Sequence, residues 1–448
     1  MRRIWFLALA ACGGSSASHP DGTVAPDGPA PDAAPALALR FERTTGAQDF
    51  TAIATLTGAD DPITFAIDRG TIDASGHVSP PQTGEYTVTA TTGALSVSRT
   101  ALVLGEVDDA WGQPEPVPGL ANTPAWEDGA SISPDGSVLT IQYLPVSIAC
   151  LTVGDPSGPA CAVIGPVAAP ARPEMPGANR VHGAAYENDC PSIGVPDLPS
   201  PLPPNSLYAL HREADDSFGD PHPIYYAGAD GCIGAFGLQL RASDAVWAFD
   251  DPRHPYGDGA RVLHGAIDPS NDVVLGTFSS DAGNLVLADE VGIVIGDEAG
   301  PTQGNPNLWD TAGGVVLFSD DEQGREDLFF NLSPSATGAY LGQQLVPSPV
   351  SIDGAQESQP FFDGATLYFR RDLVVLASDH TGGDFGAGWS QPRTILAPGP
   401  TTEGDDHVLV VGEPSTTLGA APRELYFIYG LTRADGTADL NVGRVAAR

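Results

Sequence analysis

The chain has 448 residues, of which 57 are acidic and 20 basic, so its formal net charge is −37. A surface this acidic repels nucleic acid and anionic lipid headgroups, and we expect neither as a partner. The 53 glycines and 42 prolines, with no long segment of apolar residues at helical spacing, predict an all-β chain of short strands joined by turns.

The first twelve residues have the pattern of an export signal. Arg2 and Arg3 precede a short apolar stretch that ends in Leu9-Ala10-Ala11-Cys12. This ending resembles the lipobox of bacterial lipoproteins, and the resemblance implies cleavage before Cys12 and a diacylglycerol on its sulfur. We therefore assign residues 1–12 to a signal peptide and lipobox, with a buried N-terminal strand as the alternative. Gly13, in place of the aspartate associated with inner-membrane retention, favours the outer membrane or cell surface.

Residues 13–37 are predicted to be a disordered tether. They are rich in Gly, Ser, Pro, Ala and Asp, and they show no apolar periodicity that would form a core. No later segment approaches the roughly 18–20 apolar residues that a spanning helix needs. The expected contact with the membrane is therefore the lipid anchor only.

Four cysteines remain beyond Cys12, and an even number in an exported chain suggests two disulfides. Cys150 and Cys161 flank a strong turn signal at residues 155–159, so a bridge across that turn is sterically plausible. Cys190 and Cys232 would then pair across a longer loop. Zinc binding is the alternative, although no C-x-x-C spacing is present.

Residues 38–104 alternate between apolar and polar side chains, which is typical of strands. One strand ends in Gly70-Thr71-Ile72, and a later strand over residues 84–90 places Tyr86, Val88 and Ala90 on one side. These motifs resemble those of bacterial Ig-like domains of adhesins and surface proteins. The resemblance implies an N-terminal Ig-like β-sandwich that serves as a spacer or adhesion module.

Residues 106–448 contain a repeat that combines an E-x-x-P segment, an Asp-Gly turn and an aromatic strand. Its copies begin at Glu127, Glu187, Asp272, Gln303, Glu357 and Glu403, the last two 46 residues apart, which is about one four-stranded blade. The consensus resembles the TolB-type (PD-repeat) β-propeller repeat, which implies a propeller of about six blades. Trp111-Gly112-Gln113-Pro114 lies before the first copy and is expected to supply an outer strand that closes the ring.

The sequence contains none of the common catalytic motifs. Because H-E-x-x-H, G-x-S-x-G and P-loop patterns are absent, we predict no enzyme activity, no catalytic residue and no cofactor. One acidic cluster, with Asp320, Asp321, Glu322 and Asp327, is a candidate calcium site because Ca²⁺ takes oxygen ligands. The alternative is that these carboxylates are solvated or accept hydrogen bonds from turn amides.

We therefore predict an envelope lipoprotein that acts as a binding or scaffolding module for a protein or glycan partner. The alternative is a carbohydrate-active hydrolase or lyase that uses acidic residues in the propeller funnel. Carboxylates that converge with an arginine or histidine in the centre would favour the enzyme, whereas apolar and aromatic central loops would favour binding.

Overall fold

The structure is a computed structural model that describes residues 34–44, 48–144, 206–223, 344–382, 385–400, 405–434 and 436–448, with separate strands between residues 180 and 331. Every element assigned in these residues is a β-strand, so the all-β prediction is confirmed. Within the same residues, no helix is long and apolar enough to span a bilayer. All five cysteines of the sequence analysis lie outside the described residues: Cys12, Cys150, Cys161, Cys190 and Cys232.

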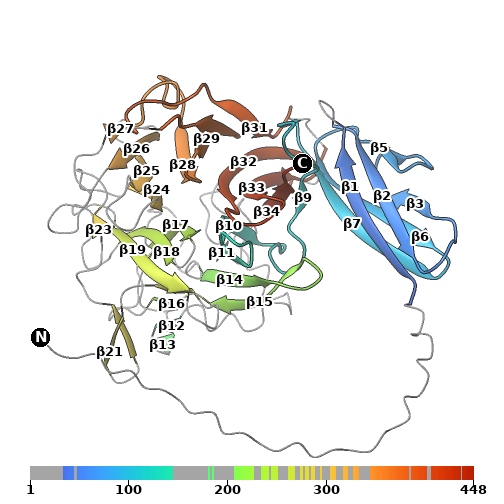
Figure 1. Cartoon of the computed structure of the whole chain (residues 1–448), viewed down its shortest axis with the longest axis horizontal. Helices are drawn as coiled ribbons and strands as arrows, with labels where there is room; N and C mark the ends of the chain where they lie inside the picture. Colours follow the sequence, from blue (N-terminus) through green and yellow to red (C-terminus); the bar gives the residue numbers. More distant parts are fainter. Residues whose placement is uncertain are drawn as a thin grey trace, which may run out of the picture.

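Seven strands at the N-terminal end form a sandwich of two antiparallel sheets (Figure 1). They are β1 (Ala36–Arg43), β2 (Phe50–Thr57), β3 (Thr64–Ile67), β4 (Thr71–Ile72), β5 (His77–Ser79), β6 (Gly84–Thr92) and β7 (Leu95–Val103). The first sheet has the order β1-β2-β5-β4 and the second β3-β6-β7. Tyr86, Val88 and Ala90 on β6 are fully buried in the core of the sandwich, as their alternation predicts.

Five larger sheets follow. The first contains β10 (Trp126–Ile132), β11 (Val138–Leu144), β14 (Ser206–Arg212) and β15 (Phe218–Pro223). The second contains β16 (Tyr225–Tyr226), β17 (Gly234–Arg241), β18 (Asp244–Asp250), β19 (Arg261–Ile267), β20 (Val273–Leu275) and β23 (Ile293–Val294). The third contains β24 (Gln303–Leu308), β25 (Val316–Asp320), β26 (Asp327–Asn331) and β27 (Gln344–Leu345).

The fourth sheet contains β28 (Glu357–Phe362), β29 (Thr366–Arg371), β30 (Val374–Asp379) and β31 (Arg393–Ala397), with β8 (Glu106–Val107) at its edge. The fifth contains β32 (His407–Thr416), β33 (Glu424–Thr432), β34 (Ala438–Ala446) and β9 (Glu115–Pro116). Two short pairs lie apart from these sheets, namely β12 (Arg180–Val181) with β13 (Ala184–Ala185), and β21 (Phe278–Asp281) with β22 (Asn284–Leu287).

The five sheets are arranged as a ring (Figure 1). Strand β10 contacts β17, β17 contacts β24, β24 contacts β28, β28 contacts β32, and β32 contacts β10. Each of these strands stands at one end of the strand order of its sheet, and we call them the inner strands. Because the contacts close on themselves, the described strands form a propeller-like ring.

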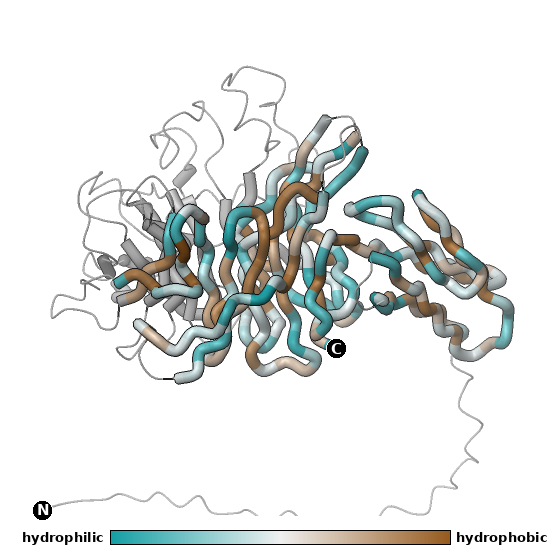
Figure 2. The backbone as a smooth tube through the Cα atoms, turned by 90° about the horizontal axis from the view of Figure 1, so that it is seen from above, coloured by the Kyte–Doolittle hydropathy of each residue, from teal (hydrophilic) through white to brown (hydrophobic). Residues whose placement is uncertain are grey.

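Neighbouring sheets of the ring pack face to face through apolar side chains. On β33, Tyr426 and Ile428 join the core shared with the first sheet, whereas Phe427 and Tyr429 join the core shared with the fourth. Successive side chains of a strand point to opposite faces, so a strand between two sheets must be apolar on both. In accordance with this, Figure 2 shows hydrophobic stretches along the described strands.

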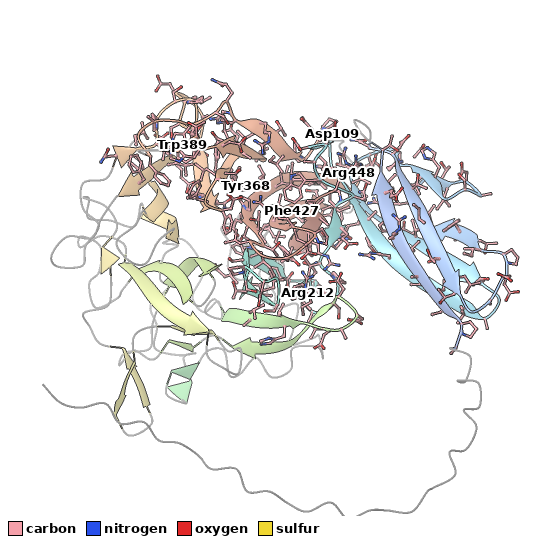
Figure 3. The ribbon with its side chains drawn as sticks, viewed as in Figure 1. Asp109, Arg212, Tyr368, Trp389, Phe427 and Arg448 are labelled. Atoms are coloured by element: carbon pink, nitrogen blue, oxygen red, sulfur yellow. The ribbon has the colours of Figure 1, made fainter. Side chains whose placement is uncertain are left out.

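The ring is closed by the segment that leaves the sandwich. Strand β9 pairs with β34, Trp111 bridges to Ala447, and the Gly112 amide donates a hydrogen bond of 2.9 Å to the Ala446 carbonyl. The prediction that the segment around Trp111 supplies an outer strand to the last sheet is therefore confirmed. Asp109 and Arg448 lie at this junction between ring and sandwich (Figure 3).

The described inner strands close a cycle of five sheets, where the sequence predicted about six blades. The difference arises from two copies of the repeat. The copy at Glu187 falls between β11 and β14, which pair within one sheet. The copy at Asp272 leads into β20, which is not an inner strand, while the inner strand β17 was not recognised as part of a copy.

Candidate functional site

Each sheet of the ring has an irregularity at the same place on its inner strand. There, two residues of the inner strand lie opposite one residue of the neighbouring strand, which is a β-bulge. The five pairs are Gly129-Ala130, Gly237-Leu238, Asn305-Pro306, Gln359-Pro360 and Glu413-Pro414. Proline fits the second place because the bulge interrupts the ladder of amide hydrogen bonds.

The bulges hold their first residue in an uncommon backbone conformation. The φ angles are 59° at Gly129, 56° at Gln359 and 49° at Glu413. Glycine adopts such values freely, but Gln359 and Glu413 carry side chains, for which this region costs on the order of 1–3 kcal/mol. Bulges of this kind re-aim side chains and are common next to functional sites.

The re-aimed side chains meet one another between the inner strands. Gln359 Nε2 donates a hydrogen bond of 3.1 Å to Glu413 Oε1, and the Glu413 amide donates one of 2.9 Å to Gln359 Oε1. On the other side, the carboxyl of Glu413 is in hydrogen-bond contact with that of Asp128 on β10. We call Asp128, Gln359 and Glu413 the axial cluster, since they come from three inner strands.

The two carboxyl groups of the axial cluster influence each other's ionisation. Burial raises the pKa of Glu413 well above its usual range, and the neighbouring Asp128 raises it further. Burial also raises the pKa of Asp128, while the charge of Arg370 acts in the opposite direction on both groups. Two carboxyl groups in contact titrate as a coupled pair, because ionising one makes ionising the other less favourable.

The axial cluster is deep in the ring yet keeps some accessible surface. Asp128, Gln359 and Glu413 are all half-buried, and no N–H or O–H group of the described residues reaches Glu413 Oε2. Carboxyl and amide oxygens in such a place accept hydrogen bonds from hydroxyl or ammonium groups. The cluster can therefore bind a polar ligand that presents donors.

The same geometry argues against a glycosidase pair. Retaining glycosidases hold their two carboxyl groups about 5–5.5 Å apart, and inverting ones about 6.5–9.5 Å apart. Asp128 and Glu413 are in hydrogen-bond contact, which leaves no room between them for a sugar carbon or a water molecule. Carboxylates and Arg370 do converge, which was the expected sign of an enzyme, but their spacing does not suit this reaction.

Most acidic residues that the repeat places in turns have structural partners. Asp363 accepts hydrogen bonds from the amides of Ala365 and Thr366 at 2.9 and 2.7 Å, and Asp135 accepts from Ser137. The Glu357 carboxylate pairs with Arg371 at 2.7 Å. These acids stabilise turns and strand ends, as the alternative in the sequence analysis supposed.

The candidate calcium residues are only partly described. Asp327 is buried at the start of β26, and its register partner on β25 is Asp320, so the pairing brings these two positions together. Asp321 and Glu322 lie outside the described residues. In the part of the chain that the structure describes, no group of three or more potential ligands is placed to hold a metal ion. The calcium site stays a prediction.

The sequence analysis did not identify the axial cluster. The signal that marks it is the residue before proline on successive inner strands, in Asn305-Pro306, Gln359-Pro360 and Glu413-Pro414. On β10 the corresponding pair is Gly129-Ala130, and Asp128 directly precedes it. An alignment of the copies on the X-Pro dipeptide would have exposed the polar position that recurs on β24, β28 and β32.

Comparisons with known proteins give only distant likenesses. No protein-family model and no curated protein matches the chain. Among solved structures, Trypanosoma rangeli sialidase is similar with 11% identity and a TM-score of 0.31, over 91% of this chain and 54% of that one. A neuraminidase-like protein of subtype N11 from A/flat-faced bat/Peru/033/2010 has 10% identity and a TM-score of 0.29, over 78% and 97%.

Prolyl oligopeptidase B from Galerina marginata is similar with 10% identity and a TM-score of 0.23, over 83% of this chain and 41% of that one. The chain therefore spans about half the length of the sialidase that it matches. Since all three TM-scores are below 0.5, no inference about function follows from these likenesses.

Proposed function

We propose that the chain is a lipid-anchored envelope protein that binds a glycan at the axis of a five-bladed β-propeller. The observation that carries this proposal is the axial cluster, in which Asp128, Gln359 and Glu413 present acceptors deep in the ring. Sugar hydroxyls are donors and acceptors at once, so they suit a cluster that contains two carboxyl groups and an amide. The anchor rests on the resemblance of residues 9–12 to a lipobox.

The count of five blades is supported by the cycle of inner strands and by the closure of the last sheet. The bulge recurs in all five sheets, which favours one repeated unit per sheet. A strand from the N-terminal side completes the last sheet, as a closed propeller requires.

We further propose that the sandwich is an Ig-like domain. Its two sheets have the orders β1-β2-β5-β4 and β3-β6-β7, which correspond to the ABED and CFG sheets of the constant-type fold. The Tyr86 hydroxyl, near the start of β6, donates a hydrogen bond of 2.8 Å to the Gln82 carbonyl. This is the arrangement of the tyrosine corner on strand F of such domains.

A hydrolase remains the second candidate, because two coupled carboxyl groups can supply an acid and a base at the same place. In that case Glu413 would be the acid, since its pKa is raised well above the usual range by burial and by Asp128. Cleavage of a glycan, rather than binding alone, would distinguish the two.

The test is titration calorimetry of the full chain with oligosaccharides released from the envelope of its native host. We expect binding that weakens about tenfold or more in Glu413→Gln, because a carboxyl group that accepts from the sugar is replaced by an amide. Asp372→Asn, on an exposed turn, is the matched control and should bind as the wild type does. Equal binding by wild type and Glu413→Gln would reject the axial site, and shortened products by mass spectrometry would favour the hydrolase.

A further inference from the structure

The junction between sandwich and ring is joined by polar contacts. Arg69 pairs with Asp406 at 3.0 Å, and Gln82 Nε2 donates a hydrogen bond of 2.7 Å to the Asp406 carbonyl. The Tyr429 hydroxyl donates one of 2.6 Å to Glu85 Oε1. These contacts hold the two parts in a fixed relation, so a pocket between them has defined walls.

Such a pocket, of about 640 Å³, lies beside the Tyr429–Glu85 contact. The sandwich contributes Glu85 and Thr100, and the last sheet of the ring contributes Arg433, Asp439 and Asn441. We call it the junction pocket. Its volume is in the range of sites that bind small molecules.

Two deeply buried side chains of the junction pocket each have one polar atom without a hydrogen-bond partner, although the Asp439 carboxyl also accepts from the Leu440 amide. Asp439 is 7% exposed and Asn441 4% exposed, yet no group of the described residues reaches Asp439 Oδ1 or Asn441 Nδ2. Arg433 approaches only the other oxygen of Asp439, at 4.0 Å. Buried polar atoms are nearly always satisfied, so an open acceptor and an open donor side by side indicate an absent binding partner.

The spacing of the two open atoms indicates the chemistry of that partner. Asp439 and Asn441 are two residues apart on β34, so they lie on the same face, with Cα atoms roughly 6.6 Å apart. The partner must donate to an acid oxygen and accept from an amide over this distance. Hydroxyl groups on a sugar ring both donate and accept hydrogen bonds. They are also uncharged, which suits a pocket whose lining includes the oppositely charged residues Arg433, Glu85 and Asp439.

The rest of the lining includes residues that suit the apolar side of such a ring. Pro116, Val117 and Pro124 line the pocket, together with the polar residues Asn122 and Thr123. A pyranose presents C–H groups on its faces and hydroxyls around its edge. We propose that the junction pocket binds one monosaccharide unit through Asp439 and Asn441, as a site separate from the axial cluster.

The test is saturation-transfer-difference NMR of the full chain with a panel of methyl glycosides, namely those of glucose, galactose, mannose and N-acetylglucosamine. We expect at least one of them to give transfer signals with the wild type. Those signals should fall at least tenfold in Asn441→Leu, which keeps the shape of the side chain but removes its donor. The melting temperature of this variant should equal or exceed that of the wild type, because an unsatisfied buried amide is removed.

The variant Asp439→Asn is a second, independent test, because it replaces the acid that should accept from the sugar by an amide, and it should also weaken the transfer signals. Glu413→Gln at the axis should leave the junction signals unchanged, which separates this site from the proposed axial one. The proposal is overturned if no glycoside gives a signal with the wild type, since water alone would then satisfy the open atoms. It is also overturned if Asn441→Leu and Asp439→Asn bind as the wild type does.

Discussion

The hydroxyl of Tyr429, on the last sheet of the ring, donates its hydrogen to Glu85 of the sandwich across 2.6 Å. Tyr429 is fully buried, and burial together with Glu85 raises its pKa well above the usual range. The phenol therefore remains a donor at any physiological pH. The sandwich is joined to the ring through a specific buried contact and not only through a linker.

Tyr429→Phe should destabilise the protein by about 1–3 kcal/mol, because the Glu85 carboxylate loses its donor at a largely desolvated place. Urea denaturation of both proteins measures the difference in the free energy of unfolding. An unchanged free energy of unfolding in Tyr429→Phe would mean that the contact contributes nothing.

Asp439 should make the stability of the protein depend on pH. Burial, followed by a smaller effect of Glu85, raises its pKa to about 7, and the charge of Arg433 only partly offsets this. Between about pH 4 and 7 the unfolded chain loses this proton while the folded chain keeps it, so stability falls as pH rises. Above pH 7 both states are ionised and the loss, on the order of 4 kcal/mol, is complete.

In Asp439→Asn this contribution is absent, because the amide does not titrate. We expect the variant to approach or exceed the stability of the wild type at pH 8 and to lose that advantage at pH 4. Chemical denaturation at a series of pH values gives the difference between the two curves. A difference that does not change between pH 4 and 8 would contradict the raised pKa.

The axial pair should titrate as a unit. In Asp128→Asn the pKa of Glu413 should fall, because the second largest cause of its elevation is the charge of Asp128. It should stay above the ordinary range, since burial is the largest cause and is unchanged. Carbon-detected NMR of the Glu413 carboxyl follows this directly, and an unaltered titration would show that the two groups do not interact.

Trp111 is expected to be important for the stability of both parts. It is 5% exposed and packs in one core with Leu102 from the sandwich and Phe427 from the ring. Trp111→Ala should cost about 3–5 kcal/mol, the usual loss for a large buried side chain. Calorimetry measures this loss of stability. Leu373→Ala, at a side chain that is 45% exposed, is the control, and its stability should change little.

The predicted lipid anchor is tested by metabolic labelling with radioactive palmitate in the native host. We expect the wild type to carry the radioactive label and the added mass of the lipid, and Cys12→Ala to carry neither. A wild type without lipid that retains Met1 would reject the signal and, with it, the proposed location at the outer membrane or cell surface.

Several features could be predicted because they depend on local pattern. The alternation over residues 84–90 places Tyr86, Val88 and Ala90 in the core whatever partner the strand has. Likewise, the segment around Trp111 has the character of an outer strand, and the only edge left for it in a ring is on the last sheet. Turn aspartates such as Asp363 accept amides within three residues, which also depends on sequence alone.

Other features depend on which strands become neighbours, and local sequence does not specify this. Two adjacent sheet strands, β11 and β14, are separated by about 60 residues in the chain, so a repeat copy between them was counted as a blade. The axial cluster needs β10, β28 and β32 to meet, which brings Asp128 next to Glu413, 285 positions apart. The pKa of Glu413 then follows from burial and from that neighbour.

The sequence by itself determined the strand content, the division into a sandwich and a ring, and the identity of the closing segment. These follow from periodicity of two, from turn residues and from repetition, all of which act over a few residues. Only the tertiary structure decided the number of sheets in the cycle, the contact between Asp128 and Glu413, and the unpartnered atoms of Asp439 and Asn441. Each of these depends on contacts between distant segments, where burial and neighbouring charge are set by packing.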